Sequence, residues 1–275
     1  MYSRLIVTCN PEFSEILMAE IAEAGFDTFM ETETGFEAYA EGNTFDKDLL
    51  VEIKEKYAHL NPLVFQHDEI EKQNWNEEWE KNVAPIIVDD TCLVRAAFHK
   101  IDKTYPYEII ITPKMSFGTG HHQTTHLMLS AQMKMDHRGK RVMDAGCGTA
   151  ILSVMAGKLG ATEVEAFDID EWSVENGNEN AANNNCTNIH IQQGKINEVT
   201  LTGTFDIILA NINKNILLAE MQQYASFLKP GGELLLSGFY VHDIPDLKAE
   251  AAKYGLTEAA RQERETWACL LLQKQ

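Results

Sequence analysis

The chain has 275 residues, which predicts two domains, and its 44% of hydrophobic and 24% of charged residues exclude long disorder. The longest apolar run near its C-terminus, residues 267–272, is far shorter than the roughly 20 residues that a membrane-spanning helix needs. Lysine and arginine number 23 against 42 acids, a net charge of −19, which disfavours nucleic acid and anionic lipid as main partners and favours basic ones. Five scattered cysteines without a paired spacing predict no disulfide framework and no metal site, and they favour a reducing cytoplasm.

The first 70 residues alternate between strand and helix patterns. Strands are predicted at 2–9, 29–32, 36–40 and 63–70, and helices at about 11–24 and 46–57. The resulting order, β-α-β-β-α-β, is that of the split ferredoxin-like unit. We therefore predict a small ferredoxin-like α+β domain over residues 1–70. Residues 1–80 hold 19 acids against 5 bases, so most of the excess negative charge lies on this part of the chain.

A change of composition follows. Residues 71–85 are rich in Glu, Lys and Asn and carry Trp75 and Trp79, which share one face of a helix at a spacing of four. We interpret this segment as a helical linker. Three extended runs at 86–88, 92–98 and 108–112 then predict a hairpin-rich entrance to a second domain over residues 86–275.

The second domain alternates regularly between strands and helices. The predicted strands are 141–144, 163–168, 189–192, 205–211 and 233–237, and the predicted helices are 149–158, 173–184, 214–228 and 244–253. Strands that are apolar on both faces are typical of a parallel sheet covered by helices on each side. The last two runs, 256–264 and 266–272, have no helix between them and predict an antiparallel pair at the edge of the sheet.

Chemistry is expected at the carboxyl ends of the parallel strands. Gly146 and Gly148 follow the first of these strands and permit a tight turn against which a ligand can lie. Asp168 ends the next strand, 22 residues after Gly146, where a carboxylate can accept hydrogen bonds from both hydroxyls of a ribose. Together the two features predict a site for an adenosine compound.

The sequence also indicates which adenosine compound is bound. The dinucleotide fingerprint needs a third glycine where this chain has Ile151, and no phosphate-binding G-x-x-x-x-G-K-[ST] motif occurs. S-adenosylmethionine carries a ribose, no phosphate and a positive charge, so it suits an acidic chain. We predict it as the cofactor.

The motifs resemble those of a known family. Residues 144–150, Asp-Ala-Gly-Cys-Gly-Thr-Ala, resemble the first motif of the seven-stranded class I methyltransferases. Asp168 resembles the acid that binds the ribose in that family. Residues 115–126, Met-Ser-Phe-Gly-Thr-Gly-His-His-Gln-Thr-Thr-His, are similar to the F-G-T-G-T-H-P-T-T signature of PrmA-type enzymes, which methylate large-subunit ribosomal protein eleven. The segment Ala210-Asn211-Ile212, Gly238 and Trp267-Ala268 fit the same family, and the resemblance covers the whole chain.

The resemblance implies a Rossmann-like, seven-stranded domain preceded by the ferredoxin-like domain, and four cofactor contacts. Thr125 would meet the methionyl end of S-adenosylmethionine, Gly146 would let it cross the strand tip, Asp168 would hold the ribose and Asn211 would lie beside the sulfonium. Thr125 could instead cap a helix, and Asn211 could instead form a turn. Ala150 replaces a glycine common in the family, a change that is tolerable if the local φ is negative.

The implied reaction is N-methylation of lysine side chains, of a terminal amine, or of both, on the ribosomal protein. Asn211 is the candidate for orienting the amine, Phe117 could wall its channel, and no dedicated base is expected. The N-terminal domain would bind the basic target protein, and flexing of the linker would present successive amines to one catalytic centre. We expect a cytoplasmic monomer that binds no metal, membrane or nucleic acid. Three alternatives stay open: a class I methyltransferase of RNA or a small molecule, a non-catalytic adenosine-binding ribosome-assembly factor, and a nicotinamide dehydrogenase, which Ile151 disfavours.

Overall fold

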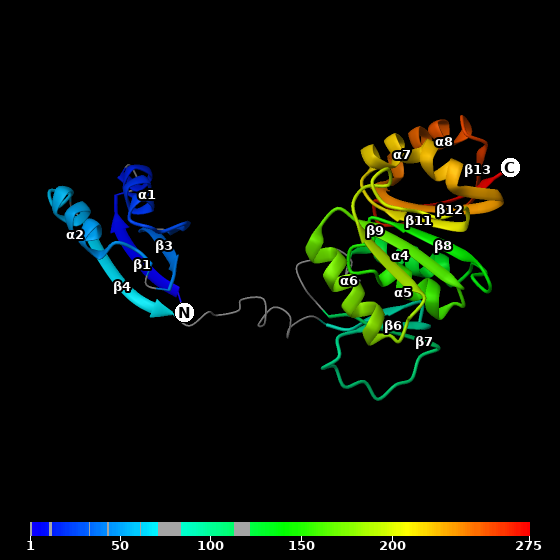
Figure 1. Ribbon diagram of the computed structural model, residues 1–275, viewed down its shortest axis with the longest axis horizontal. Helices are drawn as coiled ribbons and strands as arrows, with labels where there is room; N and C mark the ends of the chain where they lie inside the picture. The colour runs from blue at the N-terminus through cyan, green and yellow to red at the C-terminus, as the bar shows by residue number, and fades with distance from the viewer. Residues whose placement is uncertain are drawn as a thin grey trace. The chain divides into compact units, whose positions relative to one another are not determined.

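The computed structural model describes residues 2–10, 13–32, 34–42, 44–60, 62–70, 84–112 and 122–275. The chain divides into two compact units, Met1–Glu77 and Glu78–Gln275 (Figure 1). The tryptophans of the predicted linker, the start of the signature segment and Phe117 fall outside the described residues. Within the described chain, no helix combines the length and the apolarity needed to cross a bilayer.

The first unit is an antiparallel sheet with two helices. Its elements are β1 (Tyr2–Cys9), α1 (Ser14–Glu23), β2 (Thr28–Thr32), β3 (Gly35–Glu41), α2 (Lys47–Lys56) and β4 (Leu63–Ile70). The strands lie in the order β2-β3-β1-β4, and each neighbouring pair is antiparallel. All six elements occur where the sequence predicts them, within a few residues.

Alternation of side chains along the strands gives this unit its core. On β1, Leu5 and Val7 are buried while Ile6 between them is only partly covered. The helices complete the core with buried apolar residues at helical spacing, Leu17 and Ile21 on α1 and Leu50 and Ile53 on α2. The sheet is therefore buried on one face by both helices.

The second unit begins with a small sheet of β5 (Ile86–Val88), β6 (Cys92–Arg95) and β7 (Tyr107–Ile110). The expectation of hairpins is correct for β5 and β6, which pair antiparallel, and wrong for β6 and β7, which pair in parallel. Parallel neighbours need a connection that returns the chain to the same end, and residues 96–106 provide it. This long return is not distinguishable from an ordinary loop by its composition.

The large sheet has seven strands in the order β10-β9-β8-β11-β12-β14-β13. Its strands are β8 (Arg141–Ala145), β9 (Glu163–Asp168), β10 (Ile189–Gln193), β11 (Phe205–Asn211), β12 (Leu228–Tyr240), β13 (Leu256–Arg264) and β14 (Trp267–Lys274). Its helices are α4 (Gln123–Gln132), α5 (Ile151–Lys158), α6 (Glu171–Asn183), α7 (Lys214–Phe227) and α8 (Ile244–Ala252), with a 3-10 turn at Val241–Asp243. The strands from β10 to β12 are parallel, and β14 and β13 close the edge antiparallel as predicted.

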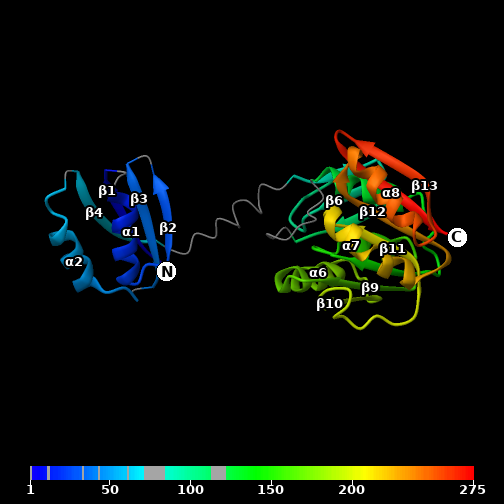
Figure 2. The same cartoon turned by 90° about the horizontal axis from the view of Figure 1, so that it is seen from above.

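Helices cover both faces of this sheet (Figure 1). Along β11, Ile207 and Leu209 face the core shared with α4 and α5, while Ile208 and Ala210 face the core shared with α7 and α8. Seen from above, α6 runs beside β9 and β10 (Figure 2). The two-sided burial explains why this strand is a continuous apolar run.

The strand order reverses between β8 and β11. The chain first moves outward from β8 to β9 and β10, then returns to β11 on the other side of β8. Ala145 at the end of β8 pairs with Ala210 of β11, so the loops after these two strands begin side by side. Such a switch point leaves a crevice at the carboxyl ends of the strands.

Candidate functional site

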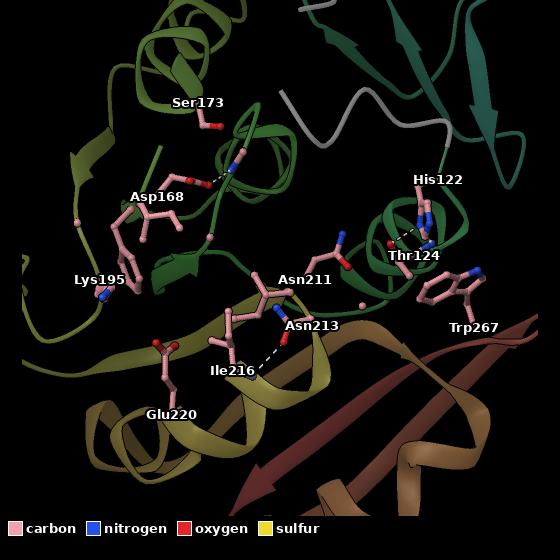
Figure 3. Close-up of a pocket in the computed structure, with 17 residues that line it drawn as sticks. His122, Thr124, Asp168, Ser173, Lys195, Asn211, Asn213, Ile216, Glu220 and Trp267 are labelled. Carbon is pink, nitrogen blue, oxygen red and sulfur yellow. Dashed lines mark hydrogen bonds between the residues drawn. The ribbon is translucent and has the colours of Figure 1, made fainter. Parts of the chain in front are cut away.

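A cavity of about 550 Å³ lies at the switch point (Figure 3). The described residues that line it lie at or just after the ends of β8, β9, β10, β11 and β12, at the start of β14, and on α4, α6 and α7. This volume is in the range of pockets that hold a small molecule or cofactor. Gly146, Asp168 and Asn211, three of the four residues expected to contact a cofactor, line this one cavity. Residues that are 65 positions apart in the sequence are therefore brought together.

The carboxylate of Asp168 is held in place by backbone groups. Gly148 N donates to its Oδ2 at 2.8 Å, and Asp170 N donates to its Oδ1 at 3.0 Å (Figure 3). Each carboxylate oxygen can accept a second hydrogen bond, so both oxygens can still bind a ligand hydroxyl. The glycine turn therefore fixes the orientation of the acid before any ligand arrives.

Two glycines allow Ile212 to lie between the strand ends. A Cβ at Gly146, where φ is +66°, would be 2.5 Å from Cγ2 of Ile212, and a Cβ at Gly238, where φ is +94°, would be 2.2 Å from the carbonyl oxygen of Ile212. All three residues line the cavity. The floor of the site thus depends on glycine both for its backbone conformation and for close approach.

The condition of a negative φ at Ala150 is not met. Ala150 has φ +58° and ψ +23°, the left-handed conformation, and it is fully buried at the N-cap of α5. This conformation costs an L-residue with a Cβ about 1–2 kcal/mol of conformational free energy. The tight path from β8 through Gly148 into α5 requires the left-handed turn whichever residue occupies position 150.

Thr125 does not line the cavity, whereas its neighbours Thr124 and His122 do. Thr125 is fully buried on α4, and its Oγ1 has no hydrogen-bond partner among the described residues. The alternative that Thr125 caps the helix is wrong, because His122 is the N-cap and its Nδ1 accepts from Thr124 N at 3.3 Å. A shift of one residue on a helix rotates a side chain by about 100°, and the sequence does not fix that rotation.

Asn211 ends β11, and its Oδ1 is buried without a hydrogen-bond partner in the described part of the chain. The turn-forming alternative fits Asn213 better, since Asn213 caps α7 by accepting from Ile216 N at 3.2 Å. An unpaired buried amide oxygen costs free energy, and because Asn211 lines the cavity, a ligand bound there can supply the missing partner.

Aromatic rings close the side of the cavity at His122. The His122 ring meets Trp267 edge-on, with centroids 4.7 Å apart, and Tyr240 stacks on Trp267 at 4.3 Å. The sequence singled out Trp267 only through the resemblance and gave no role to His122 or Lys195, both of which line the cavity (Figure 3). Lys195 follows β10, so the rule that ligands bind at carboxyl ends of strands could have found it.

Asp144 lies beneath the turn and is completely buried. Ser153 Oγ donates to its Oδ2 at 2.6 Å, while its Oδ1 finds no partner within the described ranges. Burial is the main cause that raises the pKa of Asp144 from 3.8 to about 7; the Ser153 hydrogen bond opposes the shift and the charge of Asp168 adds to it. The carboxyl group is therefore mostly protonated in the folded protein at mildly acidic pH.

This raised pKa predicts a pH-dependent stability. Because the folded state holds a proton that the unfolded chain releases near pH 4, the free energy of unfolding should fall between about pH 4 and pH 7 and change no further through this group above that. The full effect is at most about 4 kcal/mol. Asp144→Asn keeps an acceptor for Ser153 and removes the titration. In urea unfolding, the free energy of unfolding of the variant should therefore rise relative to that of the parent as the pH increases from 4 to 7. Parallel curves from pH 4 to 8 would contradict the prediction.

Comparisons with known proteins identify the family. A family model described as "Ribosomal protein L11 methyltransferase (PrmA)" matches residues 12–275. Proteins named ribosomal protein L11 methyltransferase are 40% identical over 264 residues in Phocaeicola vulgatus, covering 95% of this chain and 94% of the relative, and 48% identical over 259 residues in Porphyromonas gingivalis, covering 93% and 89%. A crystal structure of ribosomal protein L11 methylase from Lactobacillus delbrueckii subsp. bulgaricus matches with a TM-score of 0.64 and 28% identity, over 70% of this chain and 100% of that chain. The chain therefore belongs to the ribosomal protein L11 methyltransferase (PrmA) family.

Proposed function

We propose that this protein transfers methyl groups from S-adenosylmethionine to amino groups of ribosomal protein L11, on lysine side chains, on the terminal amine, or on both. The observation that carries the proposal is the meeting of Gly146, Asp168 and Asn211 in one cavity at the switch point of the sheet. The names of the relatives, which align over nearly the whole chain, support the same substrate.

The residues present suit S-adenosylmethionine. Asp168 offers two fixed acceptors for the ribose hydroxyls, and Gly146 and Gly148 line the cavity beside it without a side chain. At the other end of the cavity, Thr124 and His122 are placed to meet the methionyl part. Thr125 lies on α4 directly after Thr124, and its buried hydroxyl has no hydrogen-bond partner among the described residues. We propose that it supports the methionyl end of the site from behind Thr124. Bound there, the cofactor supplies a methyl group on a sulfonium.

Asn211 is the candidate for positioning the amine. A free lysine has a pKa of about 10.4, so it must lose a proton before its lone pair can attack a methyl carbon. Desolvation in the cavity and repulsion by a sulfonium both lower the pKa of the ammonium. The unpaired carbonyl of the Asn211 side chain, or its backbone carbonyl, can then accept from the remaining N–H and orient the lone pair. No side chain is needed as a strong base, and the released proton goes to water.

The first unit is proposed to be a ferredoxin-like domain that recognises the protein substrate. Its strand order and two covering helices support the fold, and its excess of acids suits a basic ribosomal protein. The seven-stranded unit is proposed to be the catalytic domain of the class I type. We place the protein in the cytoplasm as a monomer without nucleic-acid contacts, supported by its five free cysteines and its net charge.

The function is tested with the full-length chain. Incubation with methyl-labelled S-adenosylmethionine and ribosomal proteins from a strain lacking this activity should label L11, and mass spectrometry should locate the methyl groups on amines. Labelled RNA or labelled small metabolites with an unlabelled L11 would reject the protein substrate. Donor binding without any turnover would reject catalysis.

Removal of residues 1–70 tests the division of labour between the two units. Because the described residues that line the donor cavity all lie beyond residue 121, the shortened chain should bind S-adenosylmethionine with an affinity within about twofold of the parent. Methylation of L11 should be lost, since the acidic recognition surface is gone. Calorimetry and the labelling assay measure the two quantities separately, and full activity of the shortened chain on L11 would contradict the proposal.

A further inference from the structure

A row of asparagines runs along one side of α6. Asn176, Asn180 and Asn184 are spaced by four residues, so they lie on the same face of the helix. The first two are fully buried and the third is 7% exposed. A buried amide is costly unless its donors and acceptors are paired, so three in a row on one helix indicate a set of specific contacts.

Most of these contacts hold the chain at and just after β7. Asn184 pairs with both backbone groups of Ile110, accepting from its N at 2.9 Å and donating to its O at 2.6 Å. Asn180 Oδ1 accepts from Thr112 N at 2.7 Å, and Asn176 Nδ2 donates to Thr112 O at 3.3 Å. The side chains of α6 thus take the place of a neighbouring strand for residues 110–112.

Asn180 makes one contact to the glycine turn that Asn184 does not make. Its Nδ2 donates to Thr149 O at 2.9 Å, in the turn that follows Gly148. The contact is close along this face, because a Cβ at Gly177, one turn earlier on α6, would be 3.4 Å from Gly148 O and 3.2 Å from the Cβ of Ala150. The helix therefore touches the turn directly at two positions, and Asn180 ties the turn to Thr112.

We propose that Asn180 is a positioning residue for the methyl donor, acting through the glycine turn; this inference rests on the proposed function. The bond to Thr149 O orients the peptide that leads into the left-handed Ala150. The same turn carries Gly148 N, which donates to Asp168 and fixes the carboxylate for the ribose. Backbone hydrogen bonds from Gly146 N and Cys147 N to Phe167 O hold the start of the turn, and the Asn180 bond holds its end at Thr149. Losing the Asn180 bond therefore loosens the end of the turn next to Gly148, and the carboxylate of Asp168 is held less firmly in one orientation.

Asn180→Ala and Asn184→Ala in the full-length protein form a matched pair. Both remove a buried amide from the same helix and free part of the 110–112 backbone, but only the first breaks the bond to the turn. Both should lower the melting temperature. Calorimetry with S-adenosylmethionine should give a Kd raised about tenfold or more for Asn180→Ala and within about twofold of the parent for Asn184→Ala. In the L11 assay, Asn180→Ala should raise KM for the donor and keep kcat, since Asn211 is untouched.

Asn180→Asp decides the question if the alanine variant does not fold. Aspartate keeps the shape and the acceptor for Thr112 N, and once ionised it has no donor for Thr149 O, so calorimetry at pH 9 should show a Kd for S-adenosylmethionine raised about tenfold, with a smaller rise at pH 6 where the buried carboxyl is protonated and can still donate. If the Asn180 and Asn184 variants both bind S-adenosylmethionine as tightly as the parent, the asparagines on α6 have only a structural role. That result would overturn this inference and leave the proposed function standing. A parent protein that does not bind S-adenosylmethionine would overturn the proposed function, and this inference with it.

Discussion

Asp168→Ala is expected to weaken the binding of S-adenosylmethionine at least about 100-fold. A hydrogen bond to a charged group contributes about 1.5–3 kcal/mol, and the carboxylate can offer one to each ribose hydroxyl. The substitution also removes the acceptor of Gly148 N at 2.8 Å, so the glycine turn loses its partner. Calorimetry with the full-length protein measures the loss directly, and methylation should fall in the same assay because the site is then rarely occupied.

Asp170→Asn is the matched control for this variant. Asp170 lies two residues further on, outside the cavity lining, and caps α6 by accepting from Ser173 N at 2.9 Å. Asparagine is about as good a cap as aspartate, so donor affinity and melting temperature should stay close to those of the parent. An Asp168→Ala protein that binds the donor as tightly as the parent would remove the basis for assigning the ribose to this carboxylate.

Gly238→Ala is expected to destabilise the second unit by about 3 kcal/mol or more. The new Cβ would lie 2.2 Å from Ile212 O, 2.7 Å from Ile212 C and 2.9 Å from Ile212 N, all of them backbone atoms that no rotamer change can move. The backbone at φ +94° also disfavours any residue with a Cβ. Because Ile212 adjoins Asn211, a forced shift should also displace the residue proposed to position the amine. Thermal unfolding should show a fall of roughly 6–12 °C.

The same strand provides the control. Gly231 also lies on β12 and also has a positive φ, of +75°, but no atom of the described chain lies within 4 Å of a Cβ built there. Gly231→Ala should therefore show only the conformational cost, about 1 kcal/mol. If both variants lost the same stability, the contact with Ile212 would contribute nothing, and the close packing of the strand ends would not be what requires glycine at position 238.

Much of this fold can be predicted because its information is local. The alternation of strand and helix follows from hydrophobic period, as in the two-sided burial of β11, and this pattern identifies a parallel sheet. The positions of Gly146 and Asp168 follow from one further rule, that ligands bind where parallel strands end, whereas Asn211, which also ends a strand, was given by the family resemblance. Each of these residues is at or just after a strand end, so no knowledge of long-range packing was needed to select it. The helix α4, by contrast, received no predicted range, and β12 begins five residues earlier than expected.

The tertiary structure alone decided which atoms meet. The left-handed Ala150 follows from the path between β8 and α5, and the parallel pairing of β6 with β7 follows from how residues 96–106 return. The closeness of Gly238 to Ile212 and the link from Asn180 to Thr149 join segments 26 and 31 residues apart. The hydrophobic period of a helix or strand sets which face each of its side chains occupies, and this period can be read from adjacent residues in the sequence. The atom that a side chain contacts in another element depends on how whole helices and strands pack, to within about an ångström. No single stretch of the sequence determines that packing.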